Sequence, residues 1–262
     1  MRIVVADDAD RVAQEAADIV ERFVSASESP ALGLATGGTM EGLFAELVRR
    51  HRRRGLSFGA VDAYLLDEYV GLDRCDPNAY RSVVRRLFAC RVDLEIGSLH
   101  GPDAQAPSLG AECARYERKV RAASIGLQVL GIGSNGHIAF NEPGTPFDSV
   151  TRVVELSRRT RGDNARFFPV ENPVPARAIT QGIATILAAS ELLLLACGAG
   201  KASAVARAVE GPITETLPAS AVQLHSNVTV LLDPPAARGL STSSPGHTNG
   251  SLDGSCRNRD GA

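Results

Sequence analysis

The sequence predicts an α/β fold built on an open, mainly parallel sheet with helices on both faces. Short apolar runs rich in β-branched residues alternate with amphipathic helical patterns, and glycine-rich turns follow several of these runs. Such alternation is typical of parallel sheets, because each crossover helix packs back onto the sheet. Ligands of such sheets bind beyond the carboxyl ends of the strands, so we expect functional residues just after each strand.

The individual elements follow from the period of the apolar residues. Apolar runs of strand length predict strands at residues 2–6, 31–35, 61–67, 127–131, 150–155, 192–197 and 228–233. Apolar residues that recur every three or four positions predict helices at residues 11–23, 41–51, 78–88, 109–122, 179–188 and 201–209.

The bulk composition indicates one domain at residues 1–237. The chain has 262 residues, of which 44% are hydrophobic and 22% charged, which is ordinary for a globular protein. Residues 238–262 are rich in Ser, Gly, Asn and Asp with almost nothing apolar, so we expect a disordered tail. The net charge of -2 gives no basis for binding nucleic acid, and 5% aromatic content without Trp argues against an aromatic shelf.

The cysteines and the chain's start indicate a cytoplasmic protein. The five cysteines include no Cys-x-x-Cys pair and fit neither a disulfide framework nor a zinc site. We therefore expect reduced thiols and no metal. Acidic residues enter the N-terminus before a signal-like apolar stretch can form, and no segment is long and apolar enough to span a bilayer.

A first candidate site is the turn made by Thr36, Gly37, Gly38 and Thr39, between a predicted strand and helix. Glycines let backbone N–H groups approach a ligand, and the helix N-terminus adds partial positive charge. The turn can therefore hold a phosphate. A plain tight turn with a threonine N-cap fits these four residues equally well.

A second candidate is Asp67, which with Glu68 ends the strand predicted at residues 61–67. Adjacent residues of a strand point to opposite faces, so only one of these carboxylates is expected to face a site above the sheet. The functional interpretation makes Asp67 a general base. A helix cap or an ion pair is an equally open alternative.

A third candidate is the loop that follows the strand at residues 127–131. Its sequence, GIGSNGH, matches the Gly-x-Gly-x-x-Gly dinucleotide fingerprint, but Pro143 and Gly144 follow where that fingerprint requires a helix. We therefore expect no nicotinamide cofactor, and a compact loop that presents Asn135, His137 and Glu142. His137 titrates near neutral pH, and a nearby amide and carboxylate can orient it; the alternative is a core histidine. Arg166 and Lys201 are candidate cations for a phosphate site.

Six motifs together resemble the glucosamine-6-phosphate deaminase family, from about residue 2 to residue 233. They are LGLATGGT (32–39), LDEYVGL (66–72), DPNAY (76–80), GIGSNGHIAFNEPGT (131–145), NARFFP (164–169) and PASAVQLHSNVTVLLD (218–233). The resemblance implies conversion of glucosamine 6-phosphate and water to fructose 6-phosphate and ammonia in amino-sugar breakdown. It implies a deaminating hydrolase that isomerises its substrate and needs no cofactor or metal.

The resemblance also implies roles for the candidate residues. Asp67 moves a proton between C2 and C1, and His137 moves the proton that opens the sugar ring. Asn135 and Glu142 orient His137. The phosphate is held by Thr36, Gly37, Gly38, Thr39, Arg166 and Lys201. A mobile lid is implied at about residues 152–175.

Two departures from the family pattern affect regulation and pH dependence. Some members carry Asp where this chain has Asn135, which cannot share a negative charge with His137. Some members have an allosteric site with two basic residues; Arg152 matches one, and Val154 replaces the other. This argues against allosteric activation, and monomer and homo-oligomer both stay open.

Two other functions compete with deamination. A related class, 6-phosphogluconolactonase, shares the fold and a similar glycine–histidine loop, although residues 66–70 and 141–143 fit the deaminase better. A non-catalytic sugar-phosphate sensor is the third alternative, but it has no need of both Asp67 and His137.

Overall fold

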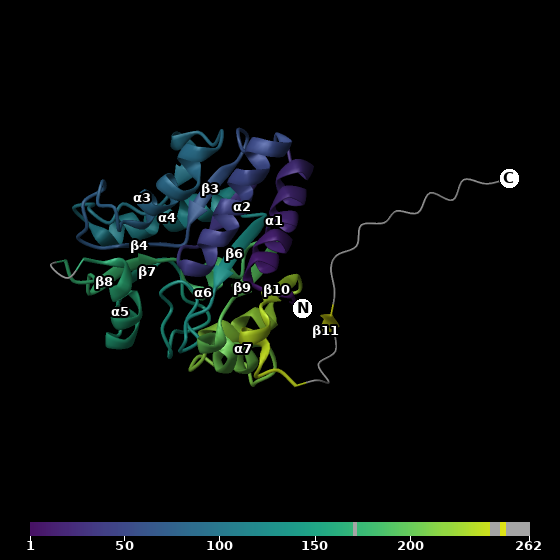
Figure 1. Cartoon of the computed structure of the whole chain (residues 1–262). Helices are drawn as coiled ribbons and strands as arrows, with labels where there is room; N and C mark the ends of the chain where they lie inside the picture. The colour runs from purple at the N-terminus through teal and green to yellow at the C-terminus, as the bar shows by residue number, and fades with distance from the viewer. Residues whose placement is uncertain (170–171, 242–246, 250–262) are drawn as a thin grey trace.

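The computed structural model describes residues 1–169, 172–241 and 247–249, and its main sheet is parallel throughout. The strand order is β11-β1-β10-β9-β6-β2-β3-β5 (Figure 1). The strands are β1 (Arg2–Val5), β2 (Ala31–Leu34), β3 (Asp62–Leu65), β5 (Leu99–His100), β6 (Leu127–Gly131), β9 (Glu191–Ala196), β10 (Val228–Leu232) and β11 (His247–Asn249). The mainly parallel α/β fold is therefore confirmed.

A small antiparallel sheet stands apart from the main sheet, on the left of Figure 1. Its order is β4-β8-β7, and its strands are β4 (Asp67–Tyr69), β7 (Arg152–Glu155) and β8 (Arg177–Thr180). β8 lies between the other two strands. Because Asp67 begins β4, it lies in this small sheet and not in the main sheet.

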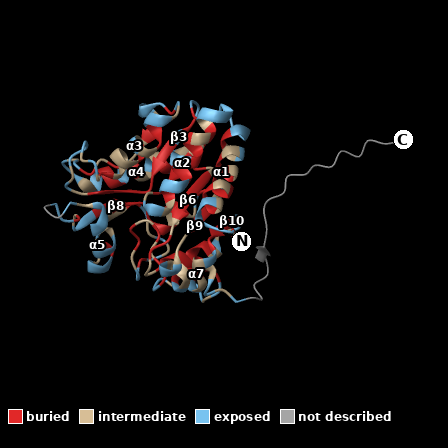
Figure 2. Ribbon diagram, in the orientation of Figure 1, coloured by how far each residue is buried: buried red, intermediate tan, exposed pale blue. Residues whose placement is uncertain are grey.

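The helices connect the strands and contribute to the core. They are α1 (Ala9–Ala26), α2 (Gly38–Arg54), α3 (Tyr80–Leu87), α4 (Leu109–Ala123), α5 (Arg158–Asn164), α6 (Ile183–Ile186), α7 (Ala202–Val209) and α8 (Pro234–Ala237). Short 3-10 turns add η1 (Ala89–Arg91), η2 (Ile96–Ser98), η3 (Ala165–Phe167), η4 (Ala199–Lys201) and η5 (Pro218–Leu224). Buried residues fill the sheet and the inner faces of the helices (Figure 2). β9 and β10 are the most apolar strands because they lie at the centre of the sheet.

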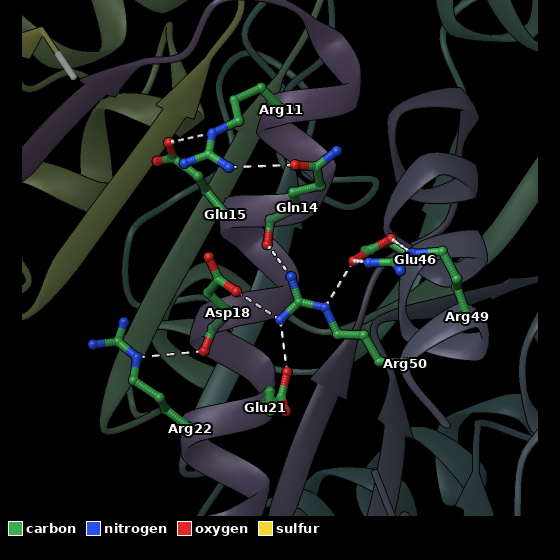
Figure 3. Close-up of polar contacts among 9 residues, drawn as sticks. All are labelled: Arg11, Gln14, Glu15, Asp18, Glu21, Arg22, Glu46, Arg49 and Arg50. Carbon is green, nitrogen blue, oxygen red and sulfur yellow. Dashed lines mark hydrogen bonds and ion pairs between the residues drawn. The ribbon is translucent and has the colours of Figure 1, made fainter. Parts of the chain in front are cut away.

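α1 and α2 are held together by a buried arginine (Figure 3). The Arg50 side chain is 4% exposed, and its guanidinium contacts Asp18 at 2.6 Å and Glu21 at 2.7 Å, both on α1. It also contacts Glu46 on its own helix at 2.8 Å and donates to the Gln14 carbonyl at 2.9 Å. Because α2 begins at the glycine–threonine turn, this cluster fixes the helix that carries one candidate site.

Two predicted elements need correction. The predicted helix at residues 179–188 is wrong: Ile179 and Thr180 end β8, and only the single turn of α6 is helical. The β-branched residues there pair between β4 and β7, so tertiary pairing overrides the helical period. The single strand predicted at residues 61–67 is two strands, because the chain leaves the main sheet at Leu66 and enters the small sheet at Asp67.

The disordered tail at residues 238–262 and the mobile lid at about residues 152–175 stay predictions. Of the tail at 238–262, residues 242–246 and 250–262 lie outside the described residues, while His247–Asn249 pairs with β1 in parallel. Of the lid at 152–175, residues 170–171 lie outside them. In the part of the chain that is described, no helix is long and apolar enough to cross a membrane.

Candidate active site

A cavity of about 660 Å³ lies where the carboxyl ends of β2, β6 and β9 meet the small sheet. Most of the candidate residues line it, although they come from segments far apart in the sequence. They are Thr36, Gly37, Gly38, Thr39, Asp67, His137, Arg166 and Lys201. Asn135 and Glu142 are absent from the lining: Asn135 contacts His137, and Glu142 contacts Asn135. The glycine–threonine turn, the carboxylate and the imidazole thus share one cavity.

The turn before α2 presents a helix N-terminus to this cavity. Gly37 has a φ of 111°, which favours glycine, and no side chain caps the helix. The threonine N-cap considered from the sequence is therefore absent. Gly38 lies beside a cation, since a Cβ added to it would be 4.0 Å from Arg166 Nη2. Uncapped N–H groups beside a guanidinium are suited to an anion.

Lys201 approaches the same cavity from the end of β9. It ends the 3-10 turn η4, which follows Gly198, a residue with a φ of 91°. Burial lowers the pKa of Lys201, and the neighbouring Arg166 and Arg159 act in the same direction against Asp163. Two cations, Arg166 and Lys201, at one end of the cavity make that end the place for a doubly charged group.

Asp67 and Glu68 point to opposite sides of β4, as the strand alternation predicts. Asp67 lines the 660 Å³ cavity, whereas Glu68 lines a separate cavity of about 350 Å³. Glu68 accepts hydrogen bonds from the backbone N–H groups of Tyr69, Tyr80 and Arg81, each at 2.9 Å. Glu68 is therefore a structural acceptor, and its carboxylate is not available to the larger cavity.

The Asp67 carboxyl is almost enclosed, with 6% of the residue exposed, and none of the described residues donates a hydrogen bond to it. Burial raises its pKa well above the usual value, and the charge of Glu68 raises it further. An unpaired carboxylate with a raised pKa is a stronger base than an exposed one. It can take a proton from a carbon acid held in the cavity.

The imidazole of His137 is held by an amide and a carboxylate. His137 Nδ1 lies 2.7 Å from Asn135 Oδ1, and Asn135 Nδ2 donates to Glu142 Oε2 at 2.8 Å. A carboxylate only accepts, so this contact fixes the amide with its oxygen toward His137. His137 Nδ1 must then carry the proton, which leaves Nε2 as the acceptor nitrogen. Burial lowers the pKa of His137 even though Glu142 acts to raise it, so the ring is held neutral.

The loop around His137 requires its glycines. A Cβ on Gly133 would come within 2.2 Å of the His137 ring, so the imidazole lies directly against this residue. Gly136 has a φ of 86°, which favours glycine. No helix follows: Ile138 and Asn141 form an isolated β-bridge, and the next helix is α5. The dinucleotide fingerprint is therefore not realised, as Pro143 and Gly144 predict.

Four aromatic residues form a cavity wall that the composition did not predict. Tyr69, Tyr80, Phe140 and Phe168 line the cavity, and Tyr69 contacts the other three rings at centroid distances of 4.8, 5.3 and 5.4 Å. Their low number argued against an aromatic surface, but folding gathers them from four segments. The sequence signal was that all four fall within the motifs at residues 66–72, 76–80, 131–145 and 164–169.

Two further arginines lie in or beside the site. Arg86 on α3 also lines the cavity, although no pattern in the sequence predicts it there. Arg152, the basic residue that matches one position of the allosteric site of some relatives, donates to Asn141 Oδ1 at 2.9 Å and to Thr145 Oγ1 at 3.2 Å. Among the residues that the structure describes, no group of three or more His, Cys, Asp or Glu side chains is arranged to hold a metal ion.

Comparison with known proteins agrees with this geometry. The family model for glucosamine-6-phosphate isomerases and 6-phosphogluconolactonase matches residues 6–231. A glucosamine-6-phosphate deaminase from Bacillus velezensis is 45% identical over 240 residues, covering 91% of this chain and 100% of that relative. A solved monomeric glucosamine-6-phosphate deaminase has a TM-score of 0.89 at 44% identity, covering 91% of this chain and 100% of the other.

The fold extends to more distant relatives. A 6-phosphogluconolactonase from Leishmania guyanensis has a TM-score of 0.73 at 20% identity, covering 92% of this chain and 98% of that one. At this identity the likeness concerns the fold alone. Together, the site geometry and the matches over nine-tenths of the sequence lead to one conclusion. The chain belongs to the glucosamine-6-phosphate isomerase and 6-phosphogluconolactonase family.

Proposed function

We propose that the protein is a glucosamine-6-phosphate deaminase, which converts glucosamine 6-phosphate and water to fructose 6-phosphate and ammonia. One observation carries the proposal: Asp67 and His137 face a single cavity whose far end is the uncapped turn with Arg166 and Lys201. Relatives of that name cover the chain almost completely at 44–46% identity, which supports the same substrate. The enzyme acts in amino-sugar breakdown.

Asp67 is the base that moves a proton between neighbouring carbons of the open-chain sugar. It takes the proton from C2; the C2–H electrons form a C1–C2 double bond, the C1 carbonyl electrons move to O1, and O1 gains a proton as the C2 ammonium loses one, which gives an enolamine. The proton held by Asp67 then returns at C1, and the nitrogen lone pair forms the C2=N bond. The resulting C2 imine reacts with water and releases ammonia. The substrate's ammonium group is attached to C2, so it lies beside the carboxyl and favours the charged form that the base needs.

His137 opens the sugar ring before this step. Its neutral ring, with Nε2 as acceptor, takes the proton of the anomeric hydroxyl and delivers a proton to the ring oxygen. Asn135 and Glu142 act through His137 as positioning residues, because they keep the proton on Nδ1.

The phosphate is bound by Thr36, Gly37, Gly38, Thr39, Arg166 and Lys201. It is remote from C1 and C2, so its binding energy positions the reacting carbons over Asp67. The described free cysteines, Cys75, Cys90, Cys113 and Cys197, support a reducing cytoplasm as the location. The solved relative is described as monomeric, which favours a monomer here.

The lactonase alternative is less well supported. Lactone hydrolysis needs no base above C2, and the lactonases compared are 17–21% identical to this chain. Turnover of 6-phosphogluconolactone without ammonia release from glucosamine 6-phosphate would favour it. Tight sugar-phosphate binding without any turnover would favour a sensor.

Substitution Asp67→Asn tests the proposed function. It keeps the shape of the side chain and removes the base, so we expect ammonia release to fall by about 10³-fold. Fructose 6-phosphate binding, measured by calorimetry, should stay within a few-fold. The matched control is Asp62→Asn, an exposed position at the opposite end of β3. Turnover by Asp67→Asn close to the unmodified enzyme would remove Asp67 from the reaction.

A further inference from the structure

A hydrogen-bonded chain runs from α5 to the imidazole of His137. Thr160, which is 1% exposed, donates its hydroxyl to Glu142 Oε1. Glu142 Oε2 accepts from Asn135 Nδ2 at 2.8 Å, and Asn135 Oδ1 accepts from His137 Nδ1 at 2.7 Å. The two oxygens of Glu142 therefore have separate tasks: one accepts from α5 and the other from the loop that carries His137.

Thr160 is itself held in place by the start of its helix. Ser157 caps α5 by accepting from Thr160 N at 3.1 Å, and its own hydroxyl donates to Thr160 Oγ1 at the same distance. The backbone N–H of Ser157 also points to Glu142 Oε1, at 3.4 Å. With the Ser157 hydroxyl donating to it, the Thr160 oxygen has its own proton directed at the carboxylate.

The charged state of Glu142 depends on these donors. Burial acts to raise its pKa, but the hydrogen bonds from Thr160 and Asn135, with His137 nearby, outweigh burial and lower it. A charged Glu142 can only accept, which forces Asn135 to turn its amide nitrogen toward it. A protonated Glu142 could donate instead, and the amide of Asn135 would then be free to turn over.

We propose that Thr160 is a positioning residue for His137, acting through Glu142 and Asn135 to select the imidazole tautomer with the proton on Nδ1. The inference rests on the proposed function, in which His137 Nε2 accepts the anomeric proton. It extends the site to a buried hydroxyl on α5 that is absent from the cavity lining. It also makes the ring-opening step depend on how α5 packs against the loop that carries His137.

The charged groups around this chain are few. Lys201 faces His137 from η4, while Arg159 and Asp163 face it from α5. None of the three lies within ion-pair distance of Glu142 among the described contacts. The Thr160 hydroxyl is therefore the donor whose loss changes Glu142 most directly.

Substitution Thr160→Val removes the hydroxyl and keeps the shape. We expect kcat to fall about tenfold with KM within about twofold, because a hydrogen bond to a charged group is lost and substrate contacts are not. Loss of the donor raises the pKa of Glu142. The deficit relative to the unmodified enzyme should therefore grow as pH falls, and Thr160→Ser should restore most of the activity.

The matched control is Thr185→Val. Thr185 is also a buried threonine, 3% exposed, and its hydroxyl donates to a carboxylate, Glu117, at 2.8 Å outside the cavity. The Thr185→Val variant should lose about as much thermal stability as Thr160→Val, and it should keep the kcat and the pH profile of the unmodified enzyme. If Thr160→Val does not fold, Thr160→Ala, which also lacks the hydroxyl, takes its place with the same expectation.

Nitrogen NMR of the histidine ring separates this inference from the proposed function. We expect His137 to hold its proton on Nδ1 in the unmodified protein and to populate both tautomers in Thr160→Val. Unchanged kinetics and an unchanged tautomer in that variant would overturn the role of Thr160. An unmodified enzyme that releases no ammonia would overturn the proposed function alone, because the NMR result does not depend on turnover.

Discussion

Asp67 and Glu68 are adjacent residues with the same ionisable group. Their side chains point to opposite faces of β4, and this separates their roles. Glu68 is saturated by three backbone donors in the smaller cavity. Asp67 has no donor among the described residues and lies in the larger cavity, where burial and the charge of Glu68 raise its pKa. Burial raises the pKa of Glu68 too, but its three backbone donors act against that rise, whereas Asp67 has no such donor and its pKa lies well above the usual value.

The pH dependence of the reaction should reflect this environment. Asp67 must be ionised to take a proton, so kcat/KM should fall as pH drops through its raised pKa, well above the usual carboxyl range. In kcat the same limb should lie at lower pH, because the bound substrate's ammonium favours the charged carboxylate. Both profiles would be measured by ammonia release and corrected for titration of the substrate's own phosphate and amine. A kcat/KM that stays level down to about pH 4 would contradict this assignment.

The phosphate contacts are tested by Arg166→Ala and Lys201→Ala. Each removes a cation from the end of the cavity beside Gly38, so we expect KM to rise about 10- to 100-fold, with a smaller change in kcat. The matched control is Arg158→Ala, an exposed arginine on the nearby α5 that does not line the cavity. An unchanged KM in both variants would exclude this end of the cavity as the phosphate site.

At the scale of elements, α2 links the stability of the fold to the site. Its first turn presents free N–H groups to the cavity, and Arg50 in its last two turns binds α1 through Asp18 and Glu21. Hydrogen bonds from Arg49, and then from Arg50, lower the pKa of Glu46 to about 2, because together they outweigh the effect of burial. The buried arginine therefore has partners for its donors on both helices.

Substitution Arg50→Met should lower the free energy of unfolding by about 1–2 kcal/mol, because the hydrogen bonds of Arg50 to Asp18, Glu21 and the Gln14 carbonyl are lost, while the carboxylates of α1 stay partly exposed to water. Urea denaturation would measure the loss. The matched control is Arg52→Met, an exposed position on the same helix, which should change stability by less than about 0.5 kcal/mol. Equal stability of the two variants would show that the cluster contributes nothing.

At the scale of the whole molecule, the site exists only because two sheets meet. Thr36 follows β2 of the main sheet, whereas Asp67 begins β4 of the small sheet, and β8 holds β4 in place. The aromatic wall formed by Tyr69, Tyr80, Phe140 and Phe168 closes the cavity between these parts. A cavity assembled in this way can enclose a substrate and exclude water during proton transfer.

The sequence by itself determined the parallel sheet and most of its strands, because short-range patterns of apolar and glycine residues encode them. It also determined the loops that carry Asp67, His137 and the turn at residues 36–39, since strand ends and glycine turns are local features. Strand alternation alone predicted that only one of the two carboxylates, Asp67 or Glu68, would face the site.

Only the tertiary structure decided the small sheet, the aromatic wall and the place of Thr160. Residues 177–180 pair with β4 and β7, which lie far away in the chain, so their helical period was misleading. Thr160 contacts Glu142 across 18 residues, and no local pattern marks that hydroxyl as part of the site. Pairing and hydrogen bonding between distant segments depend on how the whole chain packs, and no window of neighbouring residues contains that information.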